Sequence, residues 1–92
     1  MTIYTLHLRS TTGAIPNTAI ENVALKDCDW LRLPPGTFYF VSSALVAKIL
    51  GERIKTLIPA NDSFFLSEAN IGNRSGFLPK MAVDWLKKYD NS

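Results

Sequence analysis

The stretch Gly36-Thr37-Phe38-Tyr39-Phe40-Val41-Ser42-Ser43 decides the fold class of this 92-residue chain. Residues 37–41 are all β-branched or aromatic, which favours a strand buried on both faces. The preceding Pro34-Pro35-Gly36 must interrupt any strand, because proline has no backbone N–H to donate to a ladder. Residues 29–33 are therefore predicted to form a separate strand. Together the two strands predict a hairpin with a proline-stiffened turn.

An amphipathic helix is predicted to follow this hairpin. Ser42 and Ser43 are natural N-cap residues, and Pro59 is expected to end the helix. Apolar residues between these limits recur at helical spacing, with polar residues opposite them. The apolar side consists of Val46, Ile49, Leu50, Ile54, Leu57 and Ile58.

Residues 2–9 predict another strand, because Tyr4, Leu6 and Leu8 alternate with more polar residues. A short helix is expected from Pro16 and Asn17 onward. Thr18 and Glu21 have the spacing of a capping box there. The expected apolar stripe of this helix is Ile20, Val23 and Ala24.

The C-terminal third predicts one more strand and one more helix. Residues 63–68 read as a strand after a turn at Asn61-Asp62. The last helix is expected to begin near Pro79, a favourable first helical residue. Its apolar residues are Ala82, Trp85, Leu86 and Tyr89.

The expected order is β-α-β-β-α-β followed by a C-terminal helix. This is the order of an α+β, ferredoxin-like sandwich, and residues 1–92 are expected to form a single domain. Two helices would cover one face of a four-stranded antiparallel sheet. The other face then needs the last helix, a second subunit or a ligand to cover it.

Composition and charge narrow the function only a little. Ten Lys and Arg residues against eight Asp and Glu residues leave a net charge of +2, which is too small to predict nucleic-acid binding by itself. Cys28 is the only cysteine, so no internal disulfide can form and a reducing compartment is favoured. Neither a signal peptide nor a membrane-spanning stretch is recognisable, which predicts a cytoplasmic protein without membrane contact.

The order of motifs resembles small bacterial proteins related to the CRISPR-associated protein 2 family, which are close in fold to the virulence-associated protein D family. The resemblance lies in residues 36–43, Asn61-Asp62 with the following Phe64-Phe65-Leu66 strand, residues 76–80 and residues 84–88. It implies a ferredoxin-like fold, a homodimer and an origin in a mobile genetic element.

Nuclease members of that family carry an aspartate at the end of the first strand, where two subunits together hold a divalent metal. The corresponding position here is Arg9, and no acidic residue occurs from Met1 to Ile20. An arginine cannot ligate Mg²⁺, although it can pair with phosphate. The metal site therefore does not carry over, and no metal, cofactor or catalytic residue is predicted.

Five residues are candidates for binding: His7, Arg9, Ser10, Arg32 and Arg74. His7, the only histidine, shares a strand face with Arg9, but a plain sheet-face histidine is favoured over a catalytic one. A wider basic patch would comprise Arg9, Arg32, Lys48, Arg53, Lys55 and Arg74. Aromatic residues available for base stacking beside that patch would be Tyr4, Trp30 and Tyr39.

The sequence therefore predicts a small non-enzymatic binding or interaction protein. It is expected to form a homodimer through sheet edges or the C-terminal segment, and a protein partner is favoured over nucleic acid. Two alternatives stay open. One is a nuclease for RNA or DNA with an altered site around His7, Arg9 and Ser10. The other is a nucleic-acid-binding module without catalysis.

Overall fold

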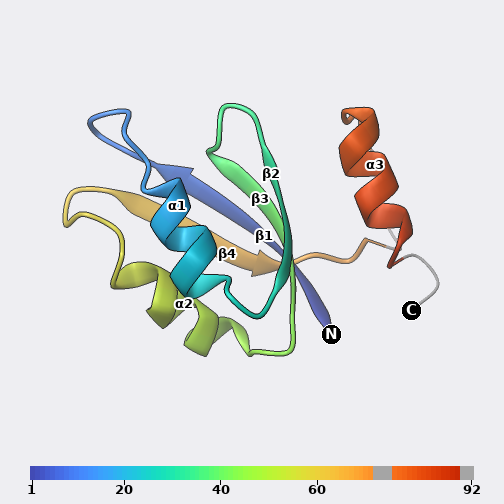
Figure 1. Ribbon diagram of the computed structural model, residues 1–92, viewed down its shortest axis with the longest axis horizontal. Helices are drawn as coiled ribbons and strands as arrows, with labels where there is room; N and C mark the ends of the chain where they lie inside the picture. Colours follow the sequence, from blue (N-terminus) through green and yellow to red (C-terminus); the bar gives the residue numbers. More distant parts are fainter. Residues whose placement is uncertain (72–75, 90–92) are drawn as a thin grey trace.

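A computed structural model describes residues 1–71 and 76–89 of the chain (Figure 1). These residues form a mixed α+β domain with four strands and three α-helices. In chain order the elements are β1 (Thr2–Arg9), α1 (Asn17–Ala19), a π-helical turn η1 (Ile20–Ala24), β2 (Asp29–Leu33), β3 (Phe38–Ser43), α2 (Ala47–Lys55), β4 (Ser63–Glu68) and α3 (Lys80–Lys87). All four predicted strands are present.

The four strands form one antiparallel sheet in the order β2-β3-β1-β4. The predicted β2–β3 hairpin is confirmed, with Leu33 opposite Phe38 at its closed end. This arrangement is compatible with a ferredoxin-like sandwich. In the described part of the chain, no helix has the length and apolar character that crossing a bilayer requires.

The main core lies between one sheet face and the helical elements η1 and α2. The helices α1 and α2 lie on the same side of the sheet in Figure 1. Even-numbered residues of β1 point into the main core, because side chains alternate across a strand. This core is formed by the buried side chains Tyr4, Leu6, Leu8, Ile20, Ala24, Leu25, Tyr39, Val41, Leu50 and Ile54.

The last helix, α3, lies on the opposite side of the sheet (Figure 1). A second buried cluster joins it to the sheet and consists of Ile3, Phe40, Ala82, Trp85 and Leu86. The indole of Trp85 stacks on the Phe40 ring with 6.1 Å between ring centroids. The last helix, a second subunit and a ligand were the three candidates to cover this face. The last helix therefore covers at least part of it.

Two expectations about α2 are wrong. Ser42 and Ser43 do not cap the helix, because β3 continues through both of them and both are buried. The helix instead begins after Val46, and Ser43 Oγ accepts a hydrogen bond from the Leu45 N–H at 3.0 Å. Its apolar side is also narrower than expected: Val46 is 60% exposed and Ile49 is 46% exposed.

The predicted capping box of the first helix does not form. No side chain caps this helix, and Glu21 bonds to the sheet instead of turning back to the helix start. The chain passes from α1 into the π-helical turn, where the Leu25 N–H donates to the Ile20 carbonyl. A π turn winds more residues per turn than an α-helix. This explains why Ile20 and Ala24 are buried while Val23 is 55% exposed.

Candidate binding surface

Of the four predicted binding residues that the structure describes, Arg32 lies apart from His7, Arg9 and Ser10. His7 and Arg9 are exposed on the α3 side of β1. Ser10 lies just after the strand, where its hydroxyl contacts Thr12 and the Ala14 carbonyl. Arg32 is on the opposite face of the sheet and pairs with Glu21, and Arg74 lies outside the described residues.

His7 lies in a row of rings that runs across three strands. It is opposite Phe65 of β4 on one side and opposite Phe38 of β3 on the other. The imidazole meets the Phe38 ring edge to face, with 4.6 Å between ring centroids. Phe65 is 67% exposed. We call Phe65, His7 and Phe38 the aromatic row.

The sequence alone does not single out Phe38 and Phe65 as surface rings, because residues 37–41 predict a strand buried on both faces and residues 63–68 predict only a strand. The sequence nevertheless indicates that one of the two rings in Phe64-Phe65 lies outside the core. Phe64 and Phe65 are adjacent in a strand, so their side chains must point to opposite faces. Only one of the two can enter the core beneath α2.

Two hollows adjoin the aromatic row. A groove of about 550 Å³ separates the sheet from the segment that leads into α3, with Thr5, Phe38 and Phe40 on the sheet side and Leu78 and Val83 on the other. A shallower hollow of about 220 Å³ lies at the end of β1 and is lined by residues 7–9 and 63–65. The aromatic row thus borders open space on the α3 side of the sheet.

At the far end of this face, α3 is attached to the start of β2 through Asp29. The Asp29 carboxylate accepts hydrogen bonds from Lys88 Nζ at 2.9 Å and from the Tyr89 hydroxyl. Lys88 also lies over the rings of Trp85 and Tyr89, 5.5 and 5.7 Å from their centroids. Burial raises the pKa of Asp29, but the hydrogen bonds from Tyr89 and Lys88 outweigh it, so the pKa lies below its ordinary value.

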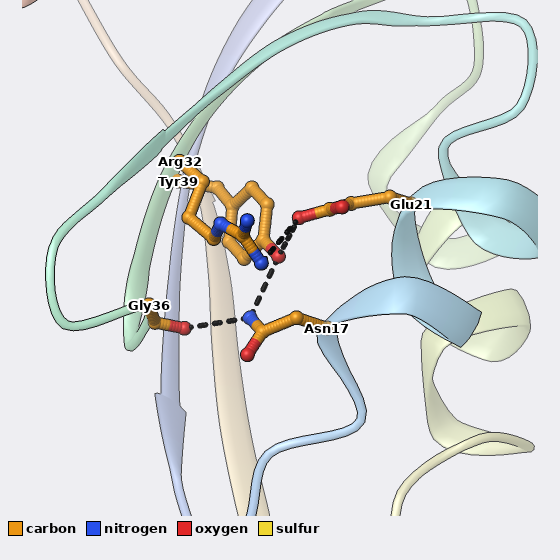
Figure 2. Close-up of polar contacts among 5 residues, drawn as sticks. All are labelled: Asn17, Glu21, Arg32, Gly36 and Tyr39. Carbon is orange, nitrogen blue, oxygen red and sulfur yellow. Dashed lines mark hydrogen bonds and ion pairs between the residues drawn. The ribbon is translucent and has the colours of Figure 1, made fainter.

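On the helix side, the first helical segment is joined to the hairpin by a polar network (Figure 2). The Tyr39 hydroxyl donates to Glu21 Oε2 at 2.5 Å and accepts from Asn17 Nδ2 at 2.8 Å. Asn17 also donates to the Gly36 carbonyl at 2.9 Å. The Arg32 guanidinium completes the network, 3.2 Å from the same Glu21 oxygen. Each of these side chains is therefore bonded to another member of the network.

This network is better suited to packing than to proton transfer. Burial, together with the hydrogen bond to Glu21, raises the pKa of Tyr39 to about 12. A hydroxyl with that pKa stays protonated near neutral pH and continues to donate to Glu21. Gly36 is in the left-handed region with φ +105° and lies close to Asn17, where a Cβ atom would be 3.2 Å from the Asn17 amide oxygen.

The expected stacking residues and basic patch are not borne out as one surface. Tyr4 and Tyr39 are buried in the main core with 1% and 0% exposure. Trp30 is half-buried against that core. Arg9 is on the α3 side of the sheet, whereas Arg32 is on the helix side.

Neither the chemistry of the described residues nor the comparisons with known proteins assigns a function to the chain. No group of three or more His, Cys, Asp or Glu side chains arranged to hold a metal ion occurs in the part of the chain that the structure describes. No family model matches the chain, and no curated protein or solved structure matches it.

Proposed function

We propose that this chain is a non-enzymatic interaction protein with a ferredoxin-like sandwich that acts as a homodimer. In this proposal, β4 pairs with β4 of a second copy and continues the sheet across the interface. The observation that carries the proposal is the outer edge of β4: among the described residues only β1 pairs with this strand, and residues 63–67 are uncharged and largely apolar.

The backbone of β4 has hydrogen-bonding groups directed away from the sheet. The Ala69 N–H donates to the Ile3 carbonyl at 2.9 Å. Because bonding alternates along an antiparallel strand, residues 63, 65 and 67 also face β1. Phe64 and Leu66 therefore present their N–H and C=O groups to the open edge.

Edge strands usually carry features that prevent pairing with another chain, such as lysine, proline or charged side chains. The β2 edge has them: Asp29 and Arg32 lie within the strand, and Pro34 follows it. The β4 edge has no charged residue before Glu68. This difference favours β4 over β2 as the pairing edge.

A second copy fits this edge because the edge is self-complementary. In a two-fold antiparallel pair, residues that face each other lie on the same side of the sheet. Centring the pair on Phe65 places Phe64 opposite Leu66 of the second copy, so that outward backbone groups meet. Phe65 then lies opposite its own equivalent, and aromatic pairs across strands stabilise a sheet by about 0.2–1 kcal/mol.

Light scattering tests this proposal on the intact chain. We expect a mass of twice 10.2 kDa for the wild type and a shift towards 10.2 kDa for Phe65→Lys, because two ammonium groups would then face each other. The matched control is Val46→Lys, which replaces an apolar residue of similar exposure just before α2 and should leave the dimer intact. A wild-type mass of 10.2 kDa, or a Phe65→Lys variant that stays dimeric, would contradict the proposal.

A further inference from the structure

The aromatic row combines ring faces, exposure and positive charge in one place. Phe65, His7 and Phe38 lie side by side across β4, β1 and β3, and the first two are exposed. Arg9 is exposed two residues after His7, so its side chain projects from the same face of β1. Nothing in the proposed homodimer accounts for this combination of His7, Phe38 and Arg9.

On the sheet face around the aromatic row, the charge is positive only. The residues of the sheet around the row are Thr5, Ser63, Ser67, Phe40, Leu31 and Leu33, none of which is acidic. Asp29 is on the same face, but it lies at the opposite end and is engaged by Lys88 and Tyr89. A ligand on the aromatic row would therefore meet Arg9 without a neighbouring carboxylate on the sheet.

We infer that the aromatic row binds single-stranded nucleic acid, with bases stacked on Phe65, His7 and Phe38 and a phosphate bound by Arg9. Base rings stack on aromatic side chains of a sheet, and arginine binds the backbone that links them. The hollow lined by residues 7–9 and 63–65 lies between the outer ring and Arg9, where the chain of sugars and phosphates would pass.

A single strand is favoured over a duplex because stacking on the rings needs bases with a free face, and the bases of a duplex are already stacked on one another. The hydroxyls of Thr5, Ser63 and Ser67 border the row and are suited to sugar or base edges. An acidic peptide would satisfy Arg9 but would leave the ring faces without a planar partner. The aromatic row therefore favours the nucleic acid.

Fluorescence anisotropy tests the inference with labelled oligouridine and oligothymidine of about 10 nucleotides, within the usual range of single-strand sites. A duplex of the same length and a polyglutamate peptide serve as competitors. We expect both single strands to bind and both competitors to displace them only weakly. Relative tightness of the two single strands then identifies RNA or DNA as the better ligand.

The variants assign binding to individual side chains. His7→Ala and Phe65→Ala should each weaken binding about 5- to 150-fold, whereas Phe65→Tyr should retain it. Arg9→Ala should lower the slope of log affinity against log salt by about one. Val46→Ala and Lys48→Ala, on the other side of the sheet, should bind like the wild type.

Circular dichroism and light scattering on each variant separate this inference from the proposed homodimer. His7→Ala should remain a dimer while losing affinity, so the two claims can fail independently. The inference is overturned if no single strand binds, if the duplex or polyglutamate binds as tightly, or if folded His7→Ala and Phe65→Ala variants keep full affinity.

Discussion

Tyr39 is the residue that joins the first helical segment to the sheet. Its ring is fully buried in the main core, while its hydroxyl bonds to Glu21 and Asn17. A buried hydroxyl with both kinds of partner stabilises the fold, because neither partner is left unsatisfied. Figure 2 shows these two partners, which come from α1 and η1.

We expect Tyr39→Phe to lower the free energy of unfolding by about 1–3 kcal/mol, measured by urea denaturation. The folded pKa of about 12 exceeds the ordinary value of 10.0, so this contribution is complete below pH 10 and is lost as pH rises through 12. The variant should therefore lose less stability than the wild type between pH 10 and pH 12. Equal stability at pH 7, or identical alkaline profiles, would show that the network does not stabilise the fold.

The same residue shows what sequence reasoning could not reach at this scale. The strand composition around Tyr39 predicted burial correctly, because aromatic and β-branched residues favour a covered sheet, whereas the prediction that Tyr39 is available for base stacking was wrong. The bond to Glu21 was missed because the Thr18–Glu21 spacing favoured a local capping box. A tertiary partner 18 residues away replaced that local bond.

At the scale of elements, α3 is held on the sheet by a small apolar cluster and by one carboxylate. The helix packs Trp85 and Leu86 against Phe40, and Asp29 bonds to Lys88 and Tyr89 at the helix end. The helix itself was predictable from its apolar spacing and Pro79. Its place on the sheet was not predictable, because an apolar helix face with this spacing could equally well pack against a second subunit.

We expect α3 to loosen on acidification. The pKa of Asp29 is lowered in the folded state, so its contribution is present above the ordinary value of 3.8 and is lost as pH falls through the lower folded value. Asp29 is partly exposed, so the contribution should be no more than about 1 kcal/mol.

Hydrogen exchange of the α3 amides measures this effect. Protection of residues 80–87 should fall in Asp29→Asn near neutral pH, and the variant should lack the additional acid-induced loss of the wild type. Asp84→Asn, which removes the exposed Lys80 pair on the same helix, is the matched control and should change protection little. If both variants protect α3 equally well, Asp29 does not hold the helix.

At the scale of the whole molecule, the sheet of the described residues has one edge with charged residues and a proline, β2, and one open edge, β4. The order of elements and the antiparallel sheet were predictable, since alternation and turn residues mark each strand. The position of Phe65 on an exposed edge was not predictable, because it depends on which strand lies at the edge of the sheet. That position supports both the proposed dimer and one end of the aromatic row.

The most direct test of the central claim is disulfide formation at position 65 in a Cys28→Ala background. Residues paired without backbone hydrogen bonds lie about 4.5 Å apart at Cα, within the range that a disulfide spans. We predict that Phe65→Cys forms a covalent dimer on mild oxidation, whereas the similarly exposed control Val46→Cys does not. A Phe65→Cys chain that stays monomeric, or that crosslinks no faster than Val46→Cys, would contradict pairing of β4 centred on Phe65.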